Sequence, residues 1–203
     1  MLIVINIPPK VELFFFFRIF ARKILSKQMA IIKSLNGITP KIGTNCFLAE
    51  TAVIIGDVEI GNDCSIWYGA VLRGDVNPIR VGNRVNIQDG AVLHTLYKNS
   101  TVEVGNDVSV GHNAIVHGAK LGNNVLVGMG AILMDHTTIH DNTIIGAGAL
   151  VPSNAILESG VYMGVPVRKV KEGSDAISAA ALKNASGYLV YKEWFLKNAE
   201  SHH

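Results

Sequence analysis

The sequence predicts a mostly β protein: a parallel β-helix built as a triangular prism, followed by a C-terminal α-helix. The first observation is a six-residue period of apolar residues that runs through most of the chain after Met29. Six-residue units are too short for helical hairpins or propeller blades, so each unit supplies one short strand and one corner. The second observation is that the period ends at Gly164-Val165-Pro166 and gives way to apolar residues at helical spacing.

The six-residue period assigns the apolar residues to three faces of the prism. Face A opens at Ile42, Ile60, Val81, Val104 and Leu121, face B at Leu48, Ile66, Ile87, Val110 and Val127, and face C at Ile54, Leu72, Leu93, Val116 and Leu133. The period continues through Ile139, Ile145, Val151, Leu157 and Met163. Neighbouring coils should lie about 4.8 Å apart, as strands do in a sheet. Breaks in the period near residues 76–80 and 95–101 predict loops at the corner that follows face C.

The chain divides into three parts. Residues 1–28 precede the period and carry five basic residues against one acidic residue. Their apolar run, LFFFF, is much shorter than a membrane span, and no secretory cleavage pattern follows it. A targeting segment and a membrane-surface helix are alternatives, but we interpret residues 1–28 as an extension outside the fold. Residues 29–170 form the β-helix domain, and residues 171–203 form a helix packed along the prism.

Composition excludes some classes of function. The net charge is +2, and after residue 28 acidic residues slightly outnumber basic ones, so there is no electrostatic basis for binding nucleic acid. No apolar run is long enough to predict a membrane span. The two cysteines, Cys46 and Cys64, cannot build a disulfide framework and favour a reducing, cytoplasmic location. They occupy equivalent positions on face A, which indicates small core residues rather than metal ligands.

The C-terminal segment reads as an amphipathic helix. Ser174 is a candidate N-cap in front of Asp175. Apolar residues then recur at Ile177, Leu182, Leu189, Trp194 and Phe195, and Gly187 can interrupt the helix. This pattern predicts a helix that covers an apolar strip of the prism.

Three histidines, His94, His112 and His117, fall in one stretch of the repeat without a cysteine among them. Three imidazoles with an open fourth position are the ligand pattern of catalytic zinc. His94 and His117 each follow the first residue of a face C unit, one coil apart, in line with Arg73. His112 lies around a corner, stacked on Asp89 at the third position of a face B unit. His94 and His117 can therefore share a metal ion, and His112 can reach an ion held by a neighbouring subunit of a three-fold trimer.

The remaining histidines predict no site. We assign His136, His140, His202 and His203 to the surface, where histidines outside a ligand set usually lie. His136 falls later in its face C unit than His117 does, so its side chain should point away from the stack.

The motifs Arg73-Gly74-Asp75 and Asn86-Ile87-Gln88-Asp89, together with the three histidines, resemble the signature of the γ-class carbonic anhydrases. The resemblance covers residues 38–168 and extends weakly to the C-terminal helix. It places the chain in the hexapeptide-repeat superfamily, whose β-helix is left-handed. It implies a homotrimer with a metal at each subunit interface, held by His94 and His117 of one chain and His112 of the next.

The resemblance also assigns roles to the other site residues. Arg73 and Asp75 would form ion pairs at the trimer interface. Gln88 would orient a metal-bound hydroxide, and Asp89 would support the ligands. Asn86 belongs to the same motif, and Tyr188 matches a C-terminal tyrosine near the metal in relatives.

The implied reaction is the reversible hydration of CO2 to bicarbonate, with Zn2+ as the metal, although Fe2+ and Co2+ accept the same imidazole ligands. In the best-known members, glutamates on a loop carry the proton to solvent. The matching loop here, residues 95–100, contains no acidic residue.

Two other functions fit the fold. A hexapeptide-repeat acyltransferase shares the prism and the trimer and often uses one histidine as a general base, for which His94, His112 or His136 could serve. That reading requires no metal and leaves the three-histidine set unexplained. A non-catalytic scaffold that holds metal would explain the loop without acids. Metal analysis combined with a CO2 hydration assay separates the three readings.

Overall fold

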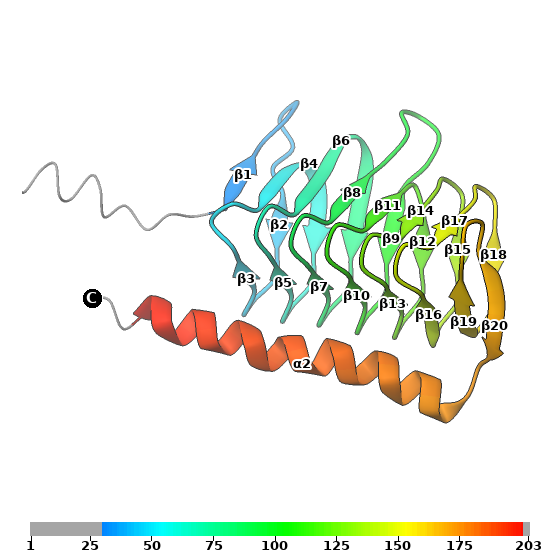
Figure 1. Ribbon diagram of the computed structural model, residues 1–203. Helices are drawn as coiled ribbons and strands as arrows, with labels where there is room; N and C mark the ends of the chain where they lie inside the picture. The colour runs from blue at the N-terminus through cyan, green and yellow to red at the C-terminus, as the bar shows by residue number, and fades with distance from the viewer. Residues whose placement is uncertain (1–29, 201–203) are drawn as a thin grey trace, which may run out of the picture.

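The computed structural model describes residues 30–200 as a parallel β-helix of about seven turns with one long helix beside it (Figure 1). The prediction for residues 1–28 lies outside the described residues. The predicted fold class is confirmed. Within residues 30–200, no helix is long and apolar enough to cross a bilayer.

The strands lie on the three predicted faces, and two long strands continue around a corner from one face to the next. Face A contains β2 (Lys41–Ile42), β9 (Val102–Val104), β12 (Lys120–Leu121), β15 (Thr138–Ile139) and β18 (Ile156–Leu157). Face B contains β3 (Phe47–Leu48), β5 (Ser65–Ile66), β7 (Asn86–Ile87), β10 (Ser109–Val110), β13 (Leu126–Val127), β16 (Thr143–Ile145), β19 (Gly160–Met163) and the antiparallel β20 (Arg168–Glu172). Face C contains β1 (Ile31–Lys33), β8 (Val92–His94), β11 (Ile115–His117), β14 (Ile132–Leu133) and β17 (Leu150–Val151). Strands β4 (Val53–Ile60) and β6 (Val71–Val81) continue from face C onto face A.

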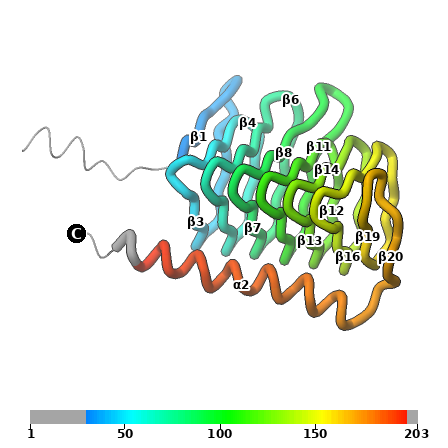
Figure 2. Tube along the Cα trace, viewed as in Figure 1, coloured from blue at the N-terminus to red at the C-terminus, as the bar shows by residue number. Residues whose placement is uncertain are grey.

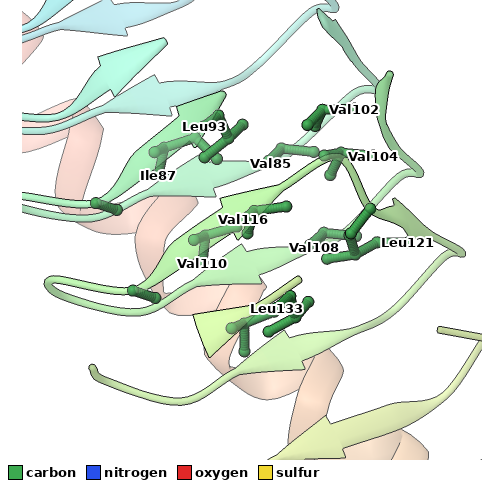
Figure 3. Packing of buried hydrophobic residues seen from close by; sticks show 14 of the residues in the cluster. Val85, Ile87, Leu93, Val102, Val104, Val108, Val110, Val116, Leu121 and Leu133 are labelled. Atoms are coloured by element: carbon green, nitrogen blue, oxygen red, sulfur yellow. The ribbon is translucent and has the colours of Figure 1, made fainter. Parts of the chain in front are cut away.

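The pairing register confirms the sequence map. Leu93 pairs with Val116 on face C, Ile87 with Val110 on face B, and Val81 with Val104 on face A. These residues point inward and pack with the equivalent residues of neighbouring coils into one continuous core (Figure 3). Because the period of six repeats the same inward position on every coil, outward side chains also stack in rows along each face.

The first predicted loop is a bulge inside a strand. Gly74 of β6 pairs with Gly56, but Ile79 pairs with Val58, so residues 75–78 stand opposite the single residue Asp57. The break therefore lies slightly earlier than the predicted 76–80. The second loop, residues 95–101, connects β8 to β9 as predicted.

The last coil corrects the end of the sequence map. Ile145 pairs with Tyr162 rather than with Met163. Tyr162 is buried, whereas Met163 is 51% exposed. The prediction that Met163 is an inward residue was wrong because the last step of the repeat is one residue short.

Helix α2 (Asp175–Glu200) runs back along the prism and covers the face B strands from β16 to β3 (Figures 1 and 2). The Ile177 N–H donates to the Ser174 side-chain oxygen at 3.4 Å, which supports the predicted cap. Gly187 does not interrupt the helix.

The buried face of α2 is narrower than the sequence predicted. Ala181 and Ala185 are buried, while Leu182 and Trp194 are 44% and 56% exposed. The prediction that Leu182 and Trp194 line the covered strip was therefore wrong. Small side chains on the packed face let the helix backbone lie close to face B, which is how α2 reaches the polar residues there.

Candidate metal centre

The first group of site residues, which we call the C half-site, comprises Arg73, Asp75, His94, His117 and Asp135. Strands β6, β8 and β11 carry the first four on neighbouring coils, and His94 pairs with His117 in register. The repeat therefore sets this part of the site, because outward residues one coil apart must stack.

The two imidazoles of the C half-site fit a shared metal ion. The ring centroids lie 5.2 Å apart, and His94 Nδ1 lies 3.2 Å from His117 Nε2. Two ligands on a tetrahedral zinc ion with bonds of ~2.0–2.1 Å lie about 3.3 Å apart. The nitrogen separation therefore matches what a divalent ion bound between these rings requires.

Each of these imidazoles is held from its other side by a carboxylate. His94 Nε2 lies 3.0 Å from Asp75 Oδ1, and His117 Nδ1 lies 3.0 Å from both carboxylate oxygens of Asp135. Arg73 forms an ion pair with Asp75 within the same chain. Metal-bound histidines typically donate their second ring N–H to such a group, which orients the ring.

The two carboxyl groups remain ionised. Burial raises the pKa of Asp75, but the hydrogen bonds with His94 and Arg73 outweigh burial and leave that pKa below its usual value. Burial likewise raises the pKa of Asp135, and the hydrogen bonds from Ser100 and His117 lower it further than burial raises it. Both groups are therefore acceptors for the imidazole N–H at neutral pH.

The second group, the B half-site, comprises Asn86, Gln88, Asp89, His112 and Tyr188. The predicted stacking of Asp89 and His112 is present, with His112 Nδ1 2.8 Å from Asp89 Oδ2. Thus all three predicted ligands have one ring nitrogen on a carboxylate. The other nitrogen of His112, Nε2, lies 3.4 Å from the Tyr188 hydroxyl.

A buried hydrogen-bond chain under α2 supports His112. Asn86 donates to the Ser109 hydroxyl at 2.8 Å, and the Gln88 amide donates to Asn86 Oδ1 at 2.9 Å. Gln88 Oε1 accepts the backbone N–H of His112 at 3.2 Å. Asn86 and Gln88 are 1% and 4% exposed, so this series of hydrogen bonds is buried and positions the backbone of His112.

Tyr188 joins the helix to this half-site. Its ring contacts Trp67 with a centroid separation of 5.4 Å, and a cavity of about 220 Å³ beside it is lined by aromatic residues and Asp89. Burial, followed by the nearby Asp89 and Tyr191, raises the pKa of Tyr188 to about 12. The phenol is therefore neutral and can act as a hydrogen-bond donor.

The two half-sites do not meet within one chain. Across residues 30–200, no three side chains among histidine, cysteine, aspartate and glutamate converge on one point where they could hold a metal ion. The structure thus brings together His94 and His117 but leaves His112 on the other side of a corner, as the sequence map expected.

Sequence reasoning missed Asp135 and Ser100. Asp135 comes from the coil beyond His117, and Ser100 comes from the loop 95–101, so neither belongs to a motif. The one available signal was an acidic residue on the coil next to stacked histidines.

The other histidines of the β-helix lie at the surface, as expected. His136 is exposed at a corner, and His140 is 3.6 Å from the exposed Glu158.

The cysteines stay outside the site. Cys64 is buried in the core and Cys46 is half-buried, and both are free thiols. Hydrogen bonding between the two thiols lowers the pKa of Cys46 to about 7. The same interaction, followed by burial, raises the pKa of Cys64. No metal role follows from their position.

Comparison with known proteins now identifies the class. The family model described as "Bacterial transferase hexapeptide (six repeats)" matches residues 39–74 and 118–153. The Escherichia coli protein YrdA is 40% identical over 173 residues, which is 82% of this chain and 94% of that protein. The Methanocaldococcus jannaschii protein named "Probable carbonic anhydrase" is 43% identical over 158 residues, 75% of this chain and 96% of that protein.

A solved structure agrees with these relatives. The hexapeptide transferase family protein from Anaplasma phagocytophilum has a TM-score of 0.75 and 36% identity, and the match covers 81% of this chain and 98% of that chain. The chain is therefore a hexapeptide-repeat protein. Within that class, it belongs to the γ-carbonic anhydrase-like family.

Proposed function

We propose that the protein is a metal-dependent γ-carbonic anhydrase that hydrates CO2 reversibly to bicarbonate at the interfaces of a homotrimer. The observation that carries the proposal is that each of the three predicted ligands, His94, His112 and His117, has one ring nitrogen on its own carboxylate. That arrangement keeps the second nitrogen of each ring available for a metal. Neither His136 nor His140 has such an arrangement within hydrogen-bonding distance.

The trimer is part of the proposal because the site is incomplete without it. His94 and His117 would bind the ion together with the partner subunit's His112. An outward row on face C, next to these histidines, is apolar on six successive coils: Val53, Val71, Val92, Ile115, Ile132 and Leu150. Ile115 and Ile132 in this row are exposed and the other four are partly exposed. A closed three-fold ring would cover such a row on every subunit.

A divalent ion held by three neutral imidazoles supplies a nucleophile at neutral pH, because it makes a water molecule acidic. The residues of the chain then have separate tasks. Asp75, Asp89 and Asp135 orient the imidazoles, and Asn86 and Gln88 fix the backbone of His112. We further propose that Gln88, which bonds the backbone of His112, would orient the water that reacts with CO2. Zn2+ is the proposed metal, with Fe2+ and Co2+ as alternatives for the same ligands, and the free thiols support a reducing, cytoplasmic compartment.

The competing functions make different demands on the same side chains. A carboxylate on one ring nitrogen suits a general base as well as a metal ligand, so these contacts alone do not separate the two functions. A single base does not require a second imidazole, whereas His94 Nδ1 and His117 Nε2 lie 3.2 Å apart, as two ligands of one ion would. A non-catalytic scaffold would keep the metal and lack turnover. The acid-free loop 95–101 is the feature that favours the scaffold.

The test uses full-length protein purified without oxygen. We expect about one metal ion per chain and CO2 hydration in stopped-flow measurements, both lost in His117→Ala and both kept in the control His140→Ala. Metal without hydration selects the scaffold. Absence of metal together with acetyl-CoA-dependent acylation of an amine or hydroxyl acceptor would contradict the proposal.

A further inference from the structure

Asp135 differs from the other two carboxylates that hold the histidines. Asp75 is paired with Arg73, and the side chain of Asp89 is 43% exposed. Among the side chains that the structure describes, no lysine or arginine lies within ion-pair distance of Asp135, and its exposure is 20%. Because no lysine or arginine of the described residues pairs with Asp135, its negative charge acts mainly on His117.

The second partner of Asp135 comes from a loop. The Ser100 hydroxyl donates to Asp135 Oδ1 at 2.6 Å while accepting the backbone N–H of Leu96 at 3.0 Å. Asn77 donates to the carbonyl oxygens of Leu96 and Ser100 at 2.7 and 2.8 Å. The loop 95–101 therefore has an internal hydrogen bond between Leu96 and Ser100, and Asn77 of β6 binds its backbone. Through Ser100 the loop also contacts the carboxylate that binds His117.

The backbone beneath this contact is shaped for it. Gly118 follows His117 and has a φ of 59°, which favours glycine. A Cβ added at Gly118 would overlap both Asp135 Oδ1 and the Ser100 hydroxyl. The absence of a side chain at Gly118 therefore leaves the space in which Ser100 and Asp135 meet.

We propose that Ser100 and Asp135 form a positioning relay that fixes the His117 ring and makes the metal affinity of the site depend on how the loop 95–101 is docked. The inference rests on the proposed metal site and deepens it, because it names residues that act through His117 without touching the ion. Ser100 acts through Asp135, and Asn77 acts through the loop.

The first experiment measures Zn2+ affinity by chelator competition on the purified trimer. Asp135→Ala should weaken binding by about 10–100-fold, the range typical of lost outer-shell partners. Ser100→Ala and Asn77→Ala should weaken it several-fold, and the Ser100→Ala, Asp135→Ala double variant should equal Asp135→Ala alone. The control Glu158→Gln alters a histidine–carboxylate pair away from the site and should leave the affinity unchanged.

The second experiment separates positioning from general destabilisation. With Co2+ as the probe, Asp135→Ala should change the visible absorption of the bound ion. Asp135→Asn should keep the wild-type spectrum, because its amide oxygen can still accept the His117 N–H. Wild-type affinity and spectrum in Asp135→Ala would overturn the relay, provided that His117→Ala loses the metal. If His117→Ala also keeps the metal, the proposed site itself is wrong.

Discussion

The two half-sites are built by different means. The C half-site follows from the repeat: His94 and His117 are outward residues at equivalent positions of successive coils, and their ring nitrogens lie 3.2 Å apart. The B half-site has one histidine, and its position depends on a buried amide chain and on α2. The local register therefore positions the stacked histidines of the C half-site, whereas the position of His112 in the B half-site also depends on contacts with the helix.

The largest expected effect comes from removing a ligand on either side. His94→Ala, His112→Ala and His117→Ala should each abolish or greatly weaken metal binding, because two imidazoles alone hold the ion poorly. His136→Ala and His140→Ala should bind as the wild type does. Metal content by elemental analysis checks this, and full metal loading of His112→Ala would mean that the B half-site is not part of the centre.

Mixing variants tests whether the half-sites meet across an interface. His112→Ala keeps an intact C half-site, and the double variant His94→Ala, His117→Ala keeps an intact B half-site. In a cyclic trimer every mixed assembly contains one interface with all three ligands, so random co-assembly of equal amounts should restore about one site in four.

The two chains should be co-expressed with different affinity tags, so that mixed trimers can be isolated and their metal measured. Each variant expressed alone is the control. Mixed trimers without metal would show that the ligands do not come from two chains.

We expect the carboxylate of the C half-site, Asp75, to contribute more to Zn2+ affinity than that of the B half-site, Asp89. Asp75 binds both Arg73 and His94 and is 21% exposed, whereas Asp89 is 43% exposed and binds His112 and, at 3.2 Å, the backbone N–H of Tyr68. Asp75→Ala should therefore weaken Zn2+ binding by about 10–100-fold. Asp89→Ala should weaken it several-fold, because water can replace a partly exposed acceptor. Chelator competition measures both, and equal losses would remove the distinction.

The sequence predicted the fold, the stacking of His94 on His117 and the stacking of Asp89 on His112 for a physical reason. Inward apolar residues impose the six-residue register, and the register dictates which outward residues stack, including Asp89 on His112. The roles of Asp135 and Ser100 depend on a contact between a loop and the following coil, which the period does not encode. The period also failed at Met163, where the final coil is shortened and Tyr162 takes the inward place.

The helix shows the other limit of sequence reading. The apolar spacing placed Ile177 and Phe195 correctly on the covered side but also predicted Leu182 and Trp194 there, which are exposed. The packed side also includes Ala181 and Ala185, whose small side chains permit close approach to face B. The contact of Tyr188 with His112 follows from that approach. Such contacts depend on the distance and rotation of α2, and neither is visible in apolar spacing alone.

The smallest expected effect concerns Tyr188, the link between α2 and the B half-site. Its hydroxyl is 3.4 Å from His112 Nε2, which is long for a hydrogen bond, and its ring contacts with Trp67 and Tyr191 would remain in phenylalanine. Tyr188→Phe should therefore change Zn2+ affinity by about threefold or less, the low end of the ~0.5–1.5 kcal/mol of an ordinary hydrogen bond.

The same variant should alter stability in alkaline solution. Burial, with Asp89 and Tyr191, raises the pKa of Tyr188 from 10.0 to about 12, so the folded chain holds this proton more tightly than the unfolded chain does. The associated stability is fully present below pH 10 and is lost as the pH rises from 10 towards 12. Denaturant midpoints of the wild type should fall more steeply over that range than those of Tyr188→Phe, while the two should run parallel between pH 7 and pH 9. Equal slopes in the alkaline range would mean that the Tyr188 phenol is not buried beside His112.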